Sequence, residues 1–469
     1  MSETGNLPLI NSDNKKRESK LSKLAVFSLI LSFPTFYFSI FTGIPAIFYA
    51  YKSITKIRKN DGKLRGKKYA KAAIIVSLVL LGLNRVIFMD AAPIENDYTM
   101  DYFGTPDSVS LQSYITLQSL GDTDKKSSGA PSIGLSEFDL KMLNTIDNAF
   151  MEKNPDKISE QILKNMRLIG IIWLDAKKGR DTLAKLDNYP QISELSDTTL
   201  FLKVPAYTKN LKYLFTLYRQ HIRLLTCRGN YEEALKELKL LDSINKKMSL
   251  GSRNIFTRIG NVQNIYIEIE AANFMINKAS TPDEILLSLK PLIDSYSREH
   301  TLLSNVIVFD YLNFKKILSK VRHAPLLKYN STLKLQRNFY EHAIAFEEKK
   351  QVQELKVWPD FYPDLPSVNM DTGGDKIYWY YKLYNPYGSF MASKIRLDMM
   401  NLVFIYMRLV NSIDMIKIIL HKRLGDEENF KTIRNKNNYK FDIEKKRIYT
   451  IIADGEEFEM PINPEVLGF

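Results

Sequence analysis

A 28-residue stretch without a charged side chain, Leu24–Tyr51, constrains this sequence more than any other feature. A membrane span needs only about 20 predominantly apolar residues. A second apolar run, Ala72–Met89, follows closely and is interrupted only by one Asn and one Arg near its end. A cleaved signal peptide is the alternative, but its apolar part is usually only about 7–15 residues long. The two runs therefore predict a membrane region over residues 24–89.

The positive charge of the chain is concentrated in the same region. The whole sequence has 66 Lys and Arg against 53 Asp and Glu, a formal charge of +13. Residues 1–89, which begin with a basic tail over residues 1–23, hold 15 of the basic residues and only four of the acidic ones. The rest of the chain is nearly neutral, so its composition indicates no nucleic-acid partner.

The segment between the two apolar runs predicts the orientation in the membrane. Lys and Arg close to a membrane accumulate on the cytoplasmic side. Past the second run the chain turns acidic, beginning with Asp90 and Glu95. We expect this basic segment to face the lipid headgroups of the cytoplasmic leaflet, and the large C-terminal part to lie outside an inner membrane. The predicted headgroup-binding residues are Lys52, Lys56, Arg58, Lys59, Lys63, Arg65, Lys67, Lys68 and Lys71.

The basic tail conflicts with this orientation if both apolar runs cross the membrane, because the tail would then lie outside as well. Pro34 and the pair Gly43 and Pro45 resolve the conflict if they break the first stretch into a re-entrant hairpin, which keeps the tail inside. The alternative places the large C-terminal part in the cytoplasm.

Part of the membrane region resembles a known bacterial module. The segment Gly43-Ile44-Pro45-Ala46-Ile47, followed by Ala50, Ile54 and Ile57, precedes the turn Gly62-Lys63-Leu64-Arg65-Gly66 and an apolar run from Ala70. Over residues 24–83 this pattern resembles the membrane module catalogued as domain of unknown function 4190. The resemblance implies a membrane hairpin and no known activity.

The remainder of the chain reads as a tether followed by helices. Residues 90–134 are rich in Asp, Ser, Gly, Pro and Thr, a composition typical of a flexible tether. Apolar residues then recur every three or four positions, which predicts buried helix faces in a helical-repeat-like domain over residues 135–325. The recurring residues include Leu143, Ile146, Phe150, Ile158, Ile162, Met166 and Ile169. A helical continuation follows over residues 326–425.

The clearest helical unit is a pair over residues 207–248. Its turn, Gly229-Asn230-Tyr231-Glu232-Glu233-Ala234-Leu235, is similar to that of tetratricopeptide repeats, in which Gly permits the turn while Tyr and Ala pack between paired helices. The motif does not recur at a fixed period, so we predict an irregular stack of antiparallel helix pairs. Residues 426–469 alternate apolar and polar side chains, which predicts a small β-meander. The predicted fold is mainly α, with an N-terminal transmembrane helical hairpin.

Recognisable chemistry is sparse in this sequence. The five histidines have no metal-binding spacing, no phosphate or dinucleotide loop is present, and no cofactor is indicated. The single cysteine, Cys227, reads as a small buried hydrophobe. Asp371-Thr372-Gly373 matches the triplet of aspartic proteases but lies in a turn-rich segment between helices. We therefore assign no catalytic, cofactor-binding or metal-binding residue.

One segment is dense in aromatic residues. Within the long loop predicted over residues 358–390, the candidate ligand-binding aromatics are Tyr378, Trp379, Tyr381, Tyr384 and Tyr387. Tyr and Trp anchor binding interfaces through an apolar body and a polar tip, although such side chains also fix loops onto the helices beneath them.

Together these features favour a non-enzymatic, membrane-anchored helical scaffold of the bacterial envelope. Its expected partners are membrane lipid and another envelope protein or polymer. The first alternative is an envelope hydrolase whose residues converge only in three dimensions, with Asp371 and His342 as candidates. The second alternative is an assembly adaptor that faces the cytoplasm.

Overall fold

The computed structural model divides into two compact units, Met1–Ala91 (unit 1) and Ala92–Phe469 (unit 2), and each unit is described by itself. The described residues are 20–35, 40–60, 64–88, 90, 92–121, 133–149, 155–195, 205–296, 303–322, 327–348, 405–406, 408–426, 439–451 and 457–468.

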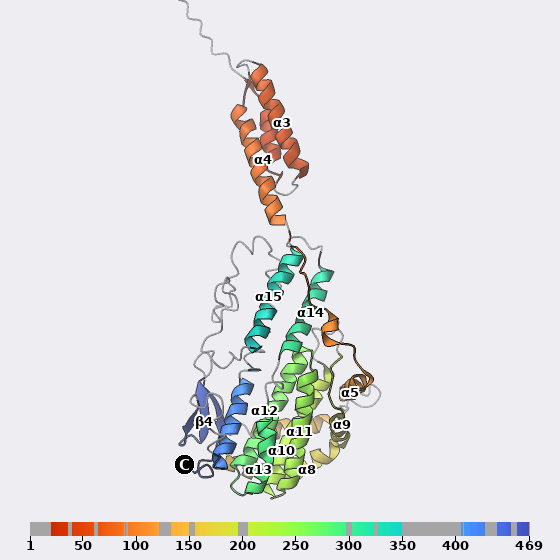
Figure 1. Cartoon of the computed structure of the whole chain (residues 1–469), viewed down its shortest axis with the longest axis vertical. Coiled ribbons are helices and arrows are strands. Elements are labelled where there is room, and N and C mark those ends of the chain that lie inside the picture. The colour runs from red at the N-terminus through yellow and green to blue at the C-terminus, as the bar shows by residue number, and fades with distance from the viewer. Residues whose placement is uncertain are drawn as a thin grey trace, which may run out of the picture. The chain divides into compact units, whose positions relative to one another are not determined.

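Unit 1 consists of helices joined at one end by a short parallel strand pair (Figure 1). Its elements are α1 (Lys23–Ser32), α3 (Ile40–Lys59), α4 (Lys67–Phe88), β1 (Lys20–Leu21) and β2 (Leu64–Arg65). Searched over its described residues, the structure contains no helix with the length and apolar character that a membrane crossing requires.

The first apolar stretch folds back on itself. Helix α1 ends at Ser32 and α3 begins at Ile40, so the stretch breaks near Pro34, as expected of a helix-breaking residue. Ser22 Oγ lies 3.0 Å from Ser53 Oγ, and the rings of Phe27 and Tyr49 are 5.4 Å apart, so α1 and α3 are antiparallel. We expected Pro45 to help break the first apolar stretch, but it lies inside α3 and does not end this helix.

Unit 2 is built around three long helices that lie side by side, α10 (Ala206–Cys227), α11 (Tyr231–Gly251) and α12 (Ile255–Asn277) (Figure 1). Gly229, at a φ of +79°, makes the turn between α10 and α11, so residues 207–248 form the predicted helix pair. The helices packed around this centre are α5 (Ser108–Ser119), α6 (Glu137–Ala149), α7 (Pro155–Lys164), α8 (Met166–Asp175), α9 (Lys177–Asp187) and α13 (Asp283–Asp294).

A second, smaller core lies between α14 (Ser304–Lys320) and α15 (Tyr329–Glu348). Residues 408–423 are also helical, in agreement with the predicted continuation. The C-terminal sheet has the order β3-β4-β5 with antiparallel neighbours, which confirms the predicted meander. Its strands are β3 (Lys440–Asp442), β4 (Arg447–Ile451) and β5 (Glu457–Pro461). The mainly helical class with a small terminal sheet is thus confirmed.

The predicted tether differs from the structure over much of its length. Residues 100–103 form the short helix η1 (Met100–Phe103), and α5 buries Leu117, which is 1% exposed, in the main core. Polar composition hid this packing because a few apolar residues are enough to dock a short helix on an existing core. Of the glycine-rich stretch within the tether, residues 122–132 lie outside the described part.

Most of the predicted helix faces are buried, including Leu143, Ile162 and Ile169. Met166 is an exception, since its side chain is 44% exposed. Helix α7 ends at Lys164 and α8 starts at Met166, so the apolar period does not continue across Asn165.

Candidate functional site

Unit 1 packs small residues inside and large apolar residues outside. Its buried side chains, all at most 4% exposed, are Ser22, Ala25, Ser28, Ser32, Thr35, Ala46, Ala50, Ser53, Ala70, Ala73 and Ser77. Its exposed large hydrophobics, all at least 45% exposed, include Phe27, Ile30, Phe33, Phe41, Ile44, Phe48, Tyr51, Ile75, Leu78, Val79 and Leu83. This distribution is the reverse of a water-soluble bundle, which buries its large apolar side chains.

The small residues allow the helices to approach closely. A Cβ placed on Gly43 would lie 2.8 Å from Thr35 Cγ2 and 2.9 Å from Leu81 Cδ1, so glycine lets α3 lie close to Thr35 and Leu81 without displacing their side chains. Ser28 donates its hydroxyl hydrogen to the carbonyl oxygen of Ala25 and therefore stays satisfied inside the bundle.

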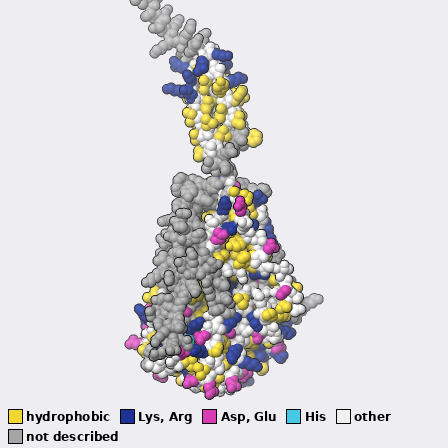
Figure 2. Space-filling model, viewed as in Figure 1, with side chains coloured by type: hydrophobic (Ala, Val, Ile, Leu, Met, Phe, Trp, Pro, Cys, Tyr) yellow, Lys and Arg dark blue, Asp and Glu magenta, His cyan; other side chains and the backbone are white. Residues whose placement is uncertain are grey.

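Basic side chains gather at one end of unit 1, and apolar side chains are prominent on the visible face beyond them (Figure 2). The strand pairing of Lys20 with Leu64 and of Leu21 with Arg65 joins the tail to the connection between α3 and α4. The helices and strands of unit 1 contain no Asp or Glu. The structure describes Lys52, Lys56, Arg58, Lys59, Arg65, Lys67, Lys68 and Lys71, whereas Lys63 lies outside the described residues.

The other sequence-derived candidates fall largely outside the described residues. This applies to the aromatic residues Tyr378, Trp379, Tyr381, Tyr384 and Tyr387, to Asp371 and to the side chain of His342. In the part of unit 2 that the structure describes, His221 Nδ1 contacts Glu237 Oε1 at 2.9 Å, and its ring stacks on Trp173 at 3.8 Å. No group of three His, Cys, Asp or Glu side chains among the described residues is arranged to hold a metal ion.

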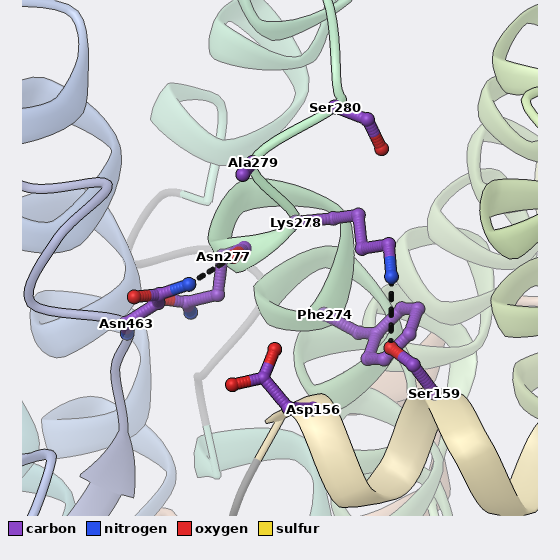
Figure 3. A pocket seen from close by; sticks show the side chains of 8 residues that line it. All are labelled: Asp156, Ser159, Phe274, Asn277, Lys278, Ala279, Ser280 and Asn463. Atoms are coloured by element: carbon purple, nitrogen blue, oxygen red, sulfur yellow. Dashed lines mark hydrogen bonds between the residues drawn. The ribbon is translucent and has the colours of Figure 1, made fainter.

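A cavity of about 250 Å³ lies in unit 2 between the start of α7, the end of α12 and the chain that follows β5 (Figure 3). Its lining residues are Asp156, Ser159, Phe274, Asn277, Lys278, Ala279, Ser280 and Asn463. Lys278 Nζ donates to Ser159 Oγ at 3.1 Å, and the amide N–H of Asn463 donates to Asn277 Oδ1 at 2.6 Å. No sequence pattern indicated this cavity, because its residues come from distant parts of the chain.

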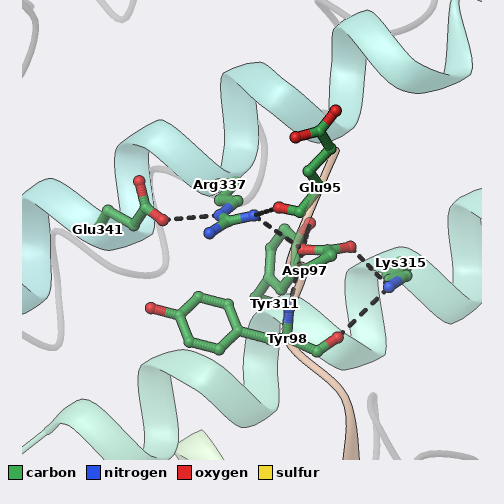
Figure 4. Close-up of polar contacts among 7 residues, drawn as sticks. All are labelled: Glu95, Asp97, Tyr98, Tyr311, Lys315, Arg337 and Glu341. Carbon is green, nitrogen blue, oxygen red and sulfur yellow. Dashed lines mark hydrogen bonds and ion pairs between the residues drawn. The ribbon is translucent and has the colours of Figure 1, made fainter. Parts of the chain in front are cut away.

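The chain enters unit 2 through a polar clamp, made of Asp97, Tyr311, Lys315 and Arg337 (Figure 4). The Asp97 carboxylate accepts hydrogen bonds from Tyr311 Oη at 2.7 Å and from Lys315 Nζ at 2.6 Å. Arg337 donates to the carbonyl oxygen of Glu95 at 3.2 Å. Burial raises the pKa of Tyr311, and its hydrogen bond to the Asp97 carboxylate raises it further. The clamp fixes residues 95–98 on α14 and α15.

Two buried carboxylates hold unit 2 together, and the sequence patterns indicated neither. Glu194, 1% exposed, accepts hydrogen bonds from Tyr207 Oη, Thr257 Oγ1 and the backbone N–H groups of Arg253 and Asn254, at 2.8–3.0 Å. It therefore joins the segment before α10 to the start of α12. Burial, followed by the Glu194 charge, raises the pKa of Tyr207 well above its usual value.

Glu268, the second carboxylate, lies on α12 and is 1% exposed. It accepts a hydrogen bond of 2.6 Å from Asn245 Nδ2. Burial, and next the nearby Asp242 carboxylate, raise the pKa of Glu268 to about 8. Burial also raises the pKa of Asp242, although Lys246 Nζ lies 2.6 Å from that carboxylate.

No family model, no curated protein and no solved structure matches this chain. The resemblance of residues 24–83 to the membrane module stays a prediction that rests on the residues quoted for it.

Proposed function

We propose that this chain is a membrane-anchored helical scaffold of the bacterial envelope, in which unit 1 is the anchor and unit 2 binds another protein or an envelope polymer. The observation that carries the proposal is the reversed packing of unit 1, with small residues inside and large apolar residues outside. In lipid, helices gain nothing from burying large apolar side chains, because the hydrocarbon around them is equally apolar. They associate through small residues that bring the backbones together, as Ala50 and Ala73 do here.

The path of the chain through unit 1 supports a cytoplasmic basic end. Helix α1 leaves that end, α3 returns to it, and α4 leaves it again over 22 residues, or about 33 Å. The basic tail and the basic connection would then share one side, as the re-entrant alternative requires. Attraction of Lys and Arg to the anionic cytoplasmic leaflet favours that side by roughly 1 kcal/mol per residue. Unit 2 would then follow on the opposite side.

The helical stack of unit 2 supports a binding role. Stacked helix pairs present extended surfaces to other macromolecules, and such surfaces need no catalytic residues. A hydrolase is not favoured by any group of side chains within the described residues.

The first prediction concerns attachment. Full-length protein is expected to stay in the membrane pellet through carbonate and high-salt washes and to need detergent for release. Replacing Ile75 and Leu78 together by Lys should move most of the protein into the wash, because a Lys at the centre of a membrane helix costs about 2.5–3.5 kcal/mol. Immunoblots of pellet and wash give the measurement.

The matched control carries two lysines on exposed apolar positions of unit 2, Leu250→Lys with Leu287→Lys, and should stay in the pellet. Release of the unaltered chain by carbonate would contradict the anchor. Equal retention of the Ile75/Leu78 variant would show that this face does not contact lipid.

The second prediction concerns sidedness and uses a Cys227→Ser background. Ser119→Cys, at an exposed position of α5, should react with a membrane-impermeant maleimide in cells with a permeabilised outer barrier, whereas Lys59→Cys at the basic end should stay unlabelled until the cells are lysed. Lys59 is chosen for the basic end because nearby Ser53 is fully buried, so a cysteine there would not react with the maleimide. The reverse pattern, with Lys59→Cys labelled and Ser119→Cys protected, would place unit 2 in the cytoplasm and support the adaptor.

A further inference from the structure

We propose that the basic end of unit 1 binds a membrane lipid that carries two phosphate groups on one headgroup, in preference to lipids with a single phosphate. The proposal rests on the membrane anchor of the proposed function and names the lipid that its basic end recognises. The residues of the basic end, all exposed, are Lys20, Lys23, Lys52, Lys56, Arg58, Lys59, Arg65, Lys67, Lys68 and Lys71 (Figure 2).

The charge of this surface is of one sign. The helices and strands that carry it contain no Asp or Glu, so these Lys and Arg side chains have no carboxylate neighbour on their own elements. Lys and Arg bind phosphate oxygens through charge-assisted hydrogen bonds. The surface therefore complements a ligand of high negative charge.

Two strand–helix units hold part of this charge side by side. Strand β1 leads directly into α1, and β2 leads directly into α4. The strands are parallel, and the N–H of Ser22 donates to the carbonyl oxygen of Arg65 at 2.9 Å. Lys23 and Lys67, the first residues of α1 and α4, therefore lie at equivalent positions on neighbouring helices. The axes of packed helices are about 8–10 Å apart.

The helix dipoles divide the basic residues into two groups. The N-terminal end of a helix carries partial positive charge, so Lys is unfavourable in the first turn and favourable in the last. The basic residues in the last turn of α3 are Lys56, Arg58 and Lys59, where the dipole favours them. Lys23 in α1, with Lys67 and Lys68 in α4, lies in a first turn that has no acidic residue. Bound anions would relieve the repulsion in this second group.

The spacing of the two helix starts suits two linked phosphates. In a lipid whose phosphates are joined by a three-carbon bridge, six single bonds of about 1.5 Å each place the phosphorus atoms at most about 8 Å apart. This span is close to the distance between packed helices. One phosphate would contact Lys23 and the other would contact Lys67 and Lys68. Once the first is bound, the second is present at a high effective concentration.

The surface next to the basic end indicates a lipid rather than a soluble phosphate compound. Leu21, Tyr51 and Tyr69 are 49%, 69% and 48% exposed. Tyr gathers at the headgroup level of membranes, because its ring has an apolar body and a polar tip. Phe27 and Phe48, four residues from Lys23 and Lys52 along their helices, are also exposed and would contact acyl chains. A lipid can contact both surfaces, whereas inorganic pyrophosphate can contact only the basic one.

Native mass spectrometry of the detergent-solubilised full chain measures the dissociation constants. The probes are diphosphatidylglycerol, phosphatidylglycerol, which has one phosphate, and phosphatidylcholine, which has no net charge. Comparison of the two anionic lipids at equal total negative charge removes the general electrostatic attraction. We expect diphosphatidylglycerol to bind at least about tenfold more tightly than phosphatidylglycerol, since its second phosphate binds within the same complex. An equal concentration of inorganic pyrophosphate should not displace it.

The variants compare the two groups of basic residues. Lys67→Gln with Lys68→Gln should weaken the binding of diphosphatidylglycerol about tenfold or more, because the contacts of one phosphate are lost. Lys56→Gln with Lys59→Gln removes the same charge from the end of α3 and should weaken it about threefold or less, since only general attraction is lost. Lys67→Arg with Lys68→Arg keeps the charge and should keep the preference.

The control, Lys236→Gln with Lys239→Gln at exposed positions of α11, should bind as the unaltered chain does. Circular dichroism checks that each variant is folded. Equal affinity of the unaltered chain for the two anionic lipids, equal losses in the α3 and α4 variants, or displacement by pyrophosphate would overturn the proposal. The carbonate wash tests the anchor separately, because the lipid preference can be absent in a protein that stays in the membrane pellet.

Discussion

Glu194→Ala is expected to lower the free energy of unfolding of unit 2 by about 3–5 kcal/mol. The carboxylate accepts from Tyr207, Thr257 and two consecutive backbone N–H groups at the start of α12. Alanine removes all of these acceptors and leaves their buried donors without a replacement. The loss should exceed that of an ordinary surface carboxylate by several kcal/mol, because the site lies inside the protein.

Glu194→Gln separates the charge of this residue from its shape. Glutamine keeps one acceptor oxygen but turns an NH₂ group toward donors. We therefore expect the free energy of unfolding of this variant to lie between those of the unaltered chain and the alanine variant. Denaturation followed by circular dichroism in mild detergent gives the measurement. The control, Glu160→Ala on the exposed side of α7, should change stability by less than about 0.5 kcal/mol. An alanine variant as stable as this control would contradict the role of Glu194.

The backbone around Glu194 also lies very close to the end of α11. The N–H of Glu194 donates to the carbonyl oxygen of Gly251 at 3.0 Å. A Cβ on Gly251 would lie 1.9 Å from the carbonyl oxygen of Ile192, so residues 192–194 and the end of α11 can approach this closely only at glycine. Glu194 and Gly251 therefore stabilise one junction between segments that are distant in the sequence.

Glu268→Gln is expected to remove a pH dependence of stability. The pKa of Glu268 is raised from 4.5 to about 8 in the folded chain, so the folded state holds a proton that the unfolded state has released between these values. Its contribution to stability is therefore complete below about pH 4.5, falls as the pH rises and is lost above about pH 8. The difference amounts to about 3–5 kcal/mol.

Glutamine mimics the protonated carboxyl group and cannot titrate. The stability of the Glu268→Gln variant relative to the unaltered chain should therefore increase between pH 5 and pH 9, which the same denaturation measurement follows at several pH values. Comparing the two chains at each pH cancels the titration of carboxylates that are distant from Glu268, so the trend reports Glu268 together with its neighbour Asp242. Glu284→Gln, at an exposed position of α13, should show no such trend. A constant difference between the Glu268→Gln variant and the unaltered chain at all pH values would contradict the shifted pKa.

Local patterns predicted the elements of this fold well. The three-to-four-residue spacing identified the buried faces of Leu143 and Ile162, Gly229 marked the turn of the helix pair, and the two-residue period identified the terminal sheet. Each of these patterns involves residues that are close together in the chain, so it can be recognised from the sequence alone. The break at Pro34 was predicted for the same reason.

The tertiary sites escaped prediction because they join residues that are far apart in the chain. Asp97 contacts Lys315, Glu194 contacts the start of α12, and Asp156 faces a cavity that Asn463 completes. An isolated Glu or Asp gives no local sign of such partners, and polar composition around residues 90–121 concealed a docked helix. The predicted aromatic loop lies outside the described residues and stays a prediction.

The reversed packing of unit 1 also sets which substitutions evolution can accept there. If unit 1 lies in lipid as proposed, the outward positions of Phe48, Ile75 and Leu78 should exchange freely among Leu, Ile, Val and Phe in relatives of this chain, since a fluid surrounding has no fixed shape. The inward positions of Ala50, Ala73 and Gly43 should vary only among Gly, Ala and Ser. A water-soluble relative would show the opposite pattern of substitution, in which the large inner residues are conserved and the surface residues vary.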